Sequence, residues 1–337
     1  MSTPVAGLAE IFYGLGEALS SEGSVSVGAV YLQMALFLEP QSPFVLAALA
    51  NVHETTKNYE AAIAAYDRIP AGSPLQQAVD IRKAQNLNLL DRVDDAKAIL
   101  ERMAASSPDD IRPLDALGNM MRGRKRYEEG IEYYSRVIAL IGKPERKHWP
   151  HFYARGTSYE RIKKWPLAEA DLQKAMQLFP DQPLVLNYLS YSWVDQGVNL
   201  QQGLKLIERA VQLKPDDGYI VDSLGWAHYR LGNYKQAAKY LERAVELRPE
   251  DPTLNDHLGD AFWRVGRRRE AQFQWSQALT LKPEPEEAVK IQAKVDTGLA
   301  EAVPPKIQKP RKAKTARTAP VKEGAETRLA PEKPALQ

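Results

Sequence analysis

The chain has 337 residues, of which 44% are hydrophobic and 26% charged, with a formal net charge of +2 and no cysteine. This composition is ordinary for a globular protein, and the lack of cysteine excludes disulfides and thiolate metal sites. No run of about 18 apolar residues occurs, so no membrane-spanning helix is predicted. The opening MSTPVAGLAEIFYGLG has no basic stretch ahead of an apolar one, so no signal peptide is predicted.

A small residue recurs along the chain at intervals of 34, 34, 34, 38, 34, 35 and 34 residues. The positions are Gly16, Ala50, Ala84, Gly118, Gly156, Ser190, Gly225 and Gly259. A fixed period of this length indicates one supersecondary unit copied along the chain. The two longer intervals fall in connections, 141–156 and 197–203, because turns absorb insertions at low thermodynamic cost.

The stretch 218–283 shows the unit most clearly, because it contains two near-identical copies. In the first copy, helical spacing predicts one helix up to about Leu231 and a second from about Tyr234 to Leu247. Gly232 is expected to take a positive φ at the end of the first helix, and Asn233 to cap the second. A helix pair this short cannot bury its apolar stripe alone, so neighbouring pairs must stack.

The pattern of Leu-Gly, aromatic, Gly, Ala, Ala and a final Pro resembles the tetratricopeptide repeat family. The run VLNYLSYSWVDQGVNL, followed by DDGYIVDSLGWAHYRLG, resembles bacterial members that are often envelope-associated. The resemblance implies an all-α fold, a right-handed α-solenoid of about eight helix pairs plus a C-terminal capping helix. The expected units are 9–40, 43–70, 77–108, 111–142, 149–180, 183–215, 218–249 and 252–283, with a capping helix over 285–302, so that 1–302 form the solenoid.

The two ends of the chain differ from the repeats. Residues 303–337 have no apolar periodicity, carry nine Lys or Arg against three Glu, and are predicted to be a disordered basic tail. The first unit is expected to expose an apolar edge, since no capping helix precedes it. Either a partner covers this edge or the natural protein continues upstream, and we favour the second interpretation.

Little in the sequence points to catalysis. His53 and His228 occupy a position that aromatic residues fill in other units, which indicates packing, and His148 and His151 lie in a loop without carboxylates at metal-ligand spacing. No nucleotide-binding, hydrolase or metalloprotease motif is present. The chain is therefore predicted to be no enzyme and to use no cofactor or metal.

One face of the leading helices in the last three units carries large aromatic residues beside Asp and Arg. Residues at i, i+3, i+4 and i+7 share a helical face, and this composition is typical of recognition surfaces. The alternative is that the rings fill gaps between adjacent repeats. The predicted partner-binding groove comprises Asn187, Tyr188, Tyr191, Asp195, Tyr219, Asp222, Trp226, Tyr229, Arg230, Asp256, His257, Asp260, Trp263 and Arg264.

The sequence thus predicts a non-catalytic scaffold that binds a peptide segment or partner protein in its concave groove. Three Asp against two Arg in the last two units favour a ligand with Lys or Arg beside apolar residues. The resemblance suggests an assembly factor of the bacterial cell envelope. As the chain stands a cytoplasmic location is expected, or a periplasmic one if an upstream signal sequence has been lost. The alternative function is nucleic-acid or anionic-surface binding through the basic tail.

Overall fold

The structure is a computed structural model, and it describes residues 3–300. This part is an α-solenoid of eight helix pairs and a final helix, with one 3-10 turn and no strand among the described residues. The pairs are α1 (Pro4–Ser21) and α2 (Val25–Leu38), α3 (Pro43–Thr55) and α4 (Tyr59–Asp67), α5 (Gln76–Leu89) and α6 (Val93–Ser106), α7 (Ile111–Gly123) and α8 (Tyr127–Ile141), α9 (Trp149–Arg161) and α10 (Trp165–Leu178), α11 (Pro183–Asp195) and α12 (Leu200–Leu213), α13 (Gly218–Arg230) and α14 (Tyr234–Leu247), and α15 (Pro252–Arg264) and α16 (Arg268–Thr280). The final helix is α17 (Pro285–Thr297), and the 3-10 turn η1 spans Arg146–His148.

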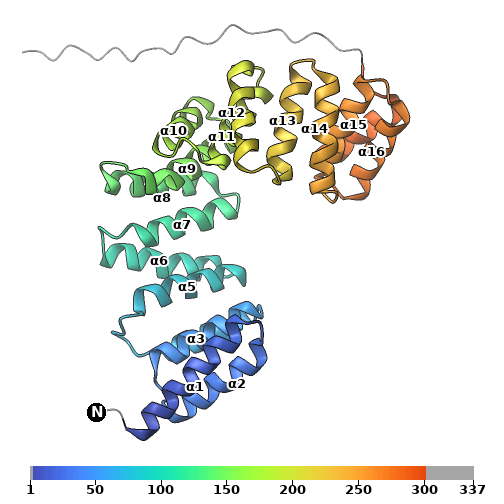
Figure 1. Cartoon of the computed structure of the whole chain (residues 1–337). Helices are drawn as coiled ribbons and strands as arrows, with labels where there is room; N and C mark the ends of the chain where they lie inside the picture. The colour runs from blue at the N-terminus through green and yellow to red at the C-terminus, as the bar shows by residue number, and fades with distance from the viewer. Residues whose placement is uncertain (1–2, 301–337) are drawn as a thin grey trace, which may run out of the picture.

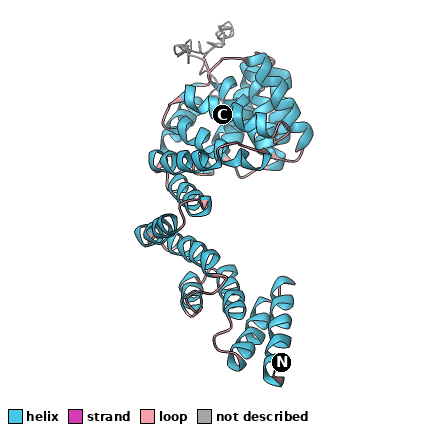
Figure 2. Cartoon of the chain, turned by 90° about the vertical axis from the view of Figure 1, so that its left-hand side faces the viewer, coloured by secondary structure: helices cyan, strands magenta, loops and turns pink. Residues whose placement is uncertain are grey.

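The pairs follow one another as a curved stack rather than a single compact body (Figure 1). The first four pairs form one arm, and the later pairs run in a different direction beyond the long connection that contains η1. Figure 2 shows the same stack turned by 90° and drawn almost entirely as helix. The predicted fold class is confirmed. The predicted basic tail, 303–337, lies outside the described residues.

The turn inside each pair has a fixed backbone requirement. In all eight pairs, the residue seven positions after the recurring small residue has a positive φ. These residues are Gly23, Lys57, Asp91, Lys125, Lys163, Gly197, Gly232 and Gly266. The predicted positive φ of Gly232 is confirmed, at +81°. Because four pairs use Lys or Asp at this strained position, the turn geometry is set by the packing of the two helices and not by glycine alone.

Helix capping differs from the expectation at Asn233, whose side chain accepts no hydrogen bond from the start of α14. Its backbone ψ is 57°, whereas an N-cap residue normally lies in the extended region. Asp217 and Asp251 do meet that requirement, with ψ values of 105° and 121°. Each accepts backbone N–H bonds from the first turn of α13 or α15, so the leading helices of the last two pairs are capped by aspartate.

The small residue of each unit is where the two helices of a pair approach most closely. A β-carbon added at Gly225 would lie 2.6 Å from Cγ of Leu241 on α14. At Gly259 the same atom would lie 2.5 Å from the ring of Trp275 on α16. These contacts explain the period of small residues, because any larger side chain would push the helices apart.

We expect Gly225→Leu to lower the free energy of unfolding by about 1–3 kcal/mol, since overpacking forces backbone shifts. Neighbouring repeats stabilise each other, so hydrogen exchange should speed up in α11–α12 and α15–α16 as well as in α13–α14. Gly123→Leu is a matched control, because a β-carbon at Gly123 meets nothing within 4 Å. Faster exchange confined to 218–247 would contradict the expected coupling.

Candidate functional site

The leading helices α11, α13 and α15, together with α17, enclose a half-open groove of about 880 Å³. Its walls combine aromatic rings with charged side chains. Several of the predicted groove residues lie in these walls. The lining residues are Tyr191, Asp195, Trp226, Pro252, Thr253, Asp256, His257, Asp260, Leu281, Lys282, Pro283, Glu284, Glu287, Lys290, Ile291 and Lys294. We call this cavity the C-terminal groove.

A stack of three rings forms part of the groove wall. The ring of Trp226 lies between Tyr229 and His257, with centroid distances of 4.8 and 4.1 Å and interplanar angles of 6° and 13°. Trp226 and Tyr229 come from α13, and His257 comes from α15 of the next pair. The indole N–H of Trp226 has no hydrogen-bond partner within the described part of the protein. The stack therefore joins two repeats, and the indole of Trp226 is packed between rings while remaining partly exposed.

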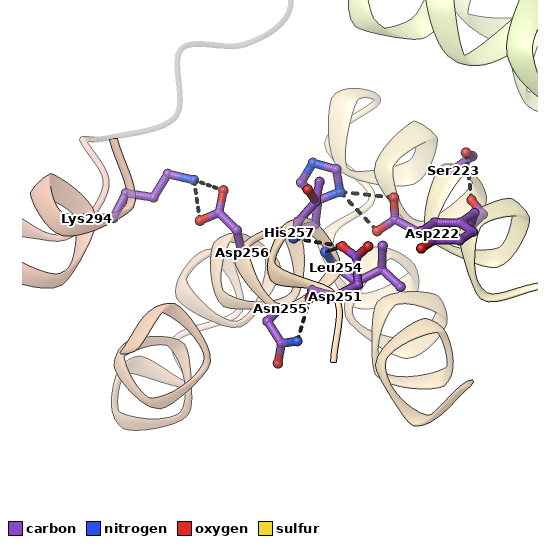
Figure 3. A network of polar contacts seen from close by, with 10 residues as sticks. Asp222, Ser223, Asp251, Leu254, Asn255, Asp256, His257 and Lys294 are labelled. Carbon is purple, nitrogen blue, oxygen red and sulfur yellow. Dashed lines mark hydrogen bonds and ion pairs between the residues drawn. The ribbon is translucent and has the colours of Figure 1, made fainter. Parts of the chain in front are cut away.

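The histidine of this stack, His257, also belongs to a buried ion pair. Nδ1 of His257 is 3.0 Å from a carboxylate oxygen of Asp222, so α15 reaches back to α13 (Figure 3). Burial alone would lower the pKa of His257, but the charge of Asp222, with Asp256 and Asp260 nearby, raises it above its ordinary value. The charged form of His257 is thus stabilised by carboxylates from two helices.

A second ion network connects α15 to α17. Nζ of Lys294 lies 2.7 Å from Asp256 and 2.8 Å from Asp260, and Figure 3 shows its side chain reaching Asp256. Nε1 of Trp275 donates to Asp260 at 2.9 Å. Burial by itself would lower the pKa of Lys294, but the two carboxylates raise it. Burial raises the pKa of Asp260, against the effect of Lys294.

The pair of Asp222 and His257 should make stability depend on pH. The folded state raises the pKa of His257, so the pair stabilises the folded protein fully at a pH below the pKa of histidine in the unfolded chain, about 6.5. This stabilisation is lost as pH rises through the pKa of His257 in the folded protein. We expect the wild-type melting temperature to fall more between pH 6 and pH 9 than that of His257→Gln, measured by circular dichroism. Parallel curves for the two proteins would show that this pair does not titrate as proposed.

Other predicted groove residues take part in contacts between repeats. Nη1 of Arg230 donates to the backbone oxygen of Asp195 at 2.7 Å, and Arg264 donates to the hydroxyl of Tyr229 at 3.2 Å. The hydroxyl of Tyr188 donates to Glu160 at 2.9 Å. Such bonds, between residues about one repeat apart, repeat along the leading helices. They fix the rotation of each pair on the one before it.

Trp263 does not line the C-terminal groove. Its indole N–H donates to the backbone oxygen of Leu299 at 3.1 Å, and the guanidinium of Arg268 lies 3.8 Å from its ring centroid. Trp263 thus fills the space between α15 and the segment after α17. Tyr219 is exposed at the start of α13 and packs beside Arg248.

Three residues of this site were missed by the sequence prediction: Lys294, Trp275 and Glu284. Lys294 lies 34 residues after Asp260, which itself lies 34 after Trp226. The repeat period therefore contained the signal, because it places Lys294 at the same position of the next leading helix. The sequence prediction treated this helix only as a cap.

The histidines outside the groove take part in packing or loop contacts. The ring of His228 stacks on Tyr240 at 5.5 Å, and burial lowers the pKa of His228. The prediction that His151 lies in a loop is wrong: it lies in α9, 2.9 Å from Asp115 of the preceding pair. His148 lies in η1 and accepts the backbone N–H of Glu145 at 2.8 Å. Within residues 3–300 no three His, Cys, Asp or Glu side chains are grouped as a metal site would require. Nor does any helix in that range combine the length and apolarity needed to cross a membrane.

Comparison with known proteins agrees with the repeat pattern. The family model described as Tetratricopeptide repeat matches residues 221–251. A TPR repeat-containing protein of Pseudomonas aeruginosa is 28% identical over 192 residues, which are 55% of this chain and 30% of that protein. The chain therefore carries tetratricopeptide repeats.

Two further similarities have lower sequence identity. Anaphase-promoting complex subunit 3 of Schizosaccharomyces pombe is 24% identical over 132 residues, 39% of this chain and 20% of that protein. The crystal structure of the APC/C hetero-tetramer Cut9–Hcn1 superposes with a TM-score of 0.58 at 14% identity, over 80% of this chain and 52% of that chain. The matches to the two curated relatives thus span less than a third of either relative's length. Tetratricopeptide-repeat proteins typically act as non-catalytic scaffolds that bind proteins or peptides, and this chain has that general architecture.

Proposed function

We propose that this chain is a scaffold whose C-terminal groove binds a peptide segment or a loop of a partner protein carrying Lys or Arg beside apolar residues. The observation that carries this proposal is the half-open cavity of about 880 Å³ beside the rigid ring of Trp226. Its volume suits a few side chains of an extended segment.

The charge of the groove supports a basic ligand. Five carboxylates line it, against three lysines, namely Asp195, Asp256, Asp260, Glu284 and Glu287 against Lys282, Lys290 and Lys294. Asp256 and Asp260 are occupied by Lys294, so they offer little free charge. On the rim Asp195 is exposed but pairs with Arg230 at 3.4 Å. Glu284 is exposed and has no ion pair among the described residues, so it is the carboxylate that a Lys or Arg of the ligand would meet first.

This distribution changes the sequence-based prediction for the three aspartates. Asp222 was expected to set the charge pattern of the ligand, but its side chain is buried and paired with His257. Reversing its charge would therefore damage the fold before it changed binding. The rim is the better place to test electrostatics.

The proposal is tested by selecting a phage-displayed library of random peptides on the immobilised chain. We expect enriched peptides to combine Lys or Arg with apolar residues, and to bind Glu284→Lys more slowly and with weaker salt dependence. Glu132→Lys is the matched control, since Glu132 is an exposed acid on α8, outside the groove. Enrichment of acidic peptides, or equal loss of binding in both variants, would refute the proposal.

We also propose, from the resemblance to bacterial relatives, that the protein serves assembly at the cell envelope. The similarity to a bacterial repeat protein of Pseudomonas aeruginosa and the scaffold fold support this proposal. Fractionation of the native host, with the protein expressed from its own reading frame, tests this. Recovery only in the cytoplasmic fraction, with no envelope partner crosslinked, would contradict it.

A further inference from the structure

The first helix pair exposes more large apolar side chains than any other part of the described chain. On α1 the exposed residues form a stripe with Leu8, Ile11 and Leu15, which we call the α1 stripe. On α2 they form a stripe with Val27, Val30, Met34 and Phe37, which we call the α2 stripe. Both follow the 3-4 spacing that places residues along one side of a helix.

The α1 stripe occupies positions that are buried in later pairs. When positions are counted from the recurring small residue, Gly16 in α1 and Gly259 in α15, Ile11 and Leu15 correspond to Leu254 and Leu258. Leu254 and Leu258 are each 2% exposed and pack with side chains of the preceding helix, α14. Ile11 and Leu15 are 59% and 43% exposed. The α1 stripe is thus a docking surface for a trailing helix, and nothing in residues 3–300 covers it.

The α2 stripe is unusual for a different reason. Its four positions correspond to Gln236, Lys239, Arg243 and Glu246 on the outer side of α14, which are all exposed and polar. On α2 the same four positions are all apolar, and Phe37 is 85% exposed. Single exposed apolar residues are common on protein surfaces, but contiguous apolar patches mark interaction sites. Four such residues along one side of α2 therefore indicate a surface that another molecule covers.

The two stripes lie on the same side of the pair. Leu36 and Val25 of α2 pack in one cluster with residues of α3, and Glu17 of α1 lines a cavity together with Asn51 and Thr55 of α3. At about 100° of rotation per residue, both stripes fall on the side of their helices away from α3. Figure 1 shows the pair at the lower end of the stack, with α3 above it.

We propose that a second copy of this chain covers this face, with α2 of each copy lying on the α1 stripe of the other. Within residues 3–300 no trailing helix packs on that side of α1, and α2 is a trailing helix with an apolar outer side, so the two stripes are complementary to each other. One two-fold contact then covers both stripes and closes without further growth. This proposal does not depend on the C-terminal groove.

Charge argues against a membrane surface as the occupant. Helices that lie on anionic membranes carry Lys or Arg beside their apolar side. Residues 3–56 contain five glutamates and no Lys or Arg, and α2 has no charged residue at all. Glu17 faces the cavity beside α3, away from the stripes, so its carboxylate does not lie in the proposed contact.

The experiment is sedimentation equilibrium of the full chain over a range of concentrations. We expect a dimer, and we expect Val30→Glu to weaken it at least about 100-fold while helix content stays unchanged, because a charge would be buried without a partner. Phe273→Glu is the matched control. Phe273 is exposed on α16 at the position that Val30 occupies on α2, so this change should leave the dimer intact.

Crosslinking tests the arrangement independently, since the natural chain has no cysteine. A mixture of Ile11→Cys and Val30→Cys should form a disulfide-linked heterodimer on oxidation, and a mixture of Ile11→Cys and Phe273→Cys should not. A chain that stays monomeric at all concentrations, a dimer that survives Val30→Glu, or a monomer that sediments with lipid vesicles would overturn the proposal.

Discussion

Replacing Lys294 by Met should lower the free energy of unfolding by about 3–5 kcal/mol, the usual cost of removing one partner from a buried ion pair. The change leaves Asp256 and Asp260 facing each other without their shared cation, since both lie within 2.8 Å of Nζ in the native protein. All three side chains are mostly buried, so solvent can compensate little. Chemical denaturation followed by circular dichroism measures the effect.

Lys290→Met is the control for this change. Lys290 lies one turn earlier on the same helix, and both it and its partner Glu287 are more than half exposed. Removing a surface pair usually changes stability by less than about 0.5 kcal/mol. If the two variants lose the same stability, the network of Asp256, Asp260 and Lys294 is not what holds α17 on α15.

Replacing Trp226 by Ala should weaken binding of a selected peptide by about 2 kcal/mol or more, if the ring is an anchor of the C-terminal groove. Its ring lines the groove and is stacked with His257 and Tyr229. The same change removes part of that stack, so the melting temperature should also fall. Affinity by calorimetry and melting temperature must therefore be measured on one preparation, at a temperature where the variant remains folded.

Trp263→Ala separates the two effects. Trp263 packs between α15 and the segment around Leu299, outside the groove lining, so its loss should reduce stability with little change in affinity. A Trp226→Ala protein with a lowered melting temperature and unchanged affinity would identify Trp226 as a gap-filling residue as well. The proposed groove would then have to be abandoned.

The sequence alone determined the repeat architecture. The spacing of small residues from Gly16 to Gly259 predicts where two helices approach closely, and the structure confirms that helix pairs follow this spacing. The turns were predicted only where glycine marks them. Lys57, Lys125 and Lys163 adopt the same left-handed conformation without that signal, because the packed helices impose it.

The composition of the candidate groove was also readable from the sequence, since a constant period places Tyr191, Trp226 and Asp260 at equivalent positions of successive helices. The charge balance of the groove could not be predicted from the sequence. Whether Asp222 is free or paired depends on His257, 35 residues later, and this contact exists only because adjacent repeats are rotated by a particular amount.

Only the tertiary structure decided which apolar side chains are buried and which are exposed to solvent. The α2 segment VSVGAVYLQMALFL is apolar on all sides, a pattern that in a globular protein indicates a buried helix. In the stack only one side of α2 meets α1 and α3, and Val30, Met34 and Phe37 are left on the surface. A local pattern specifies which side chains avoid water, but the neighbours that shield them are contributed by distant parts of the chain or by another molecule.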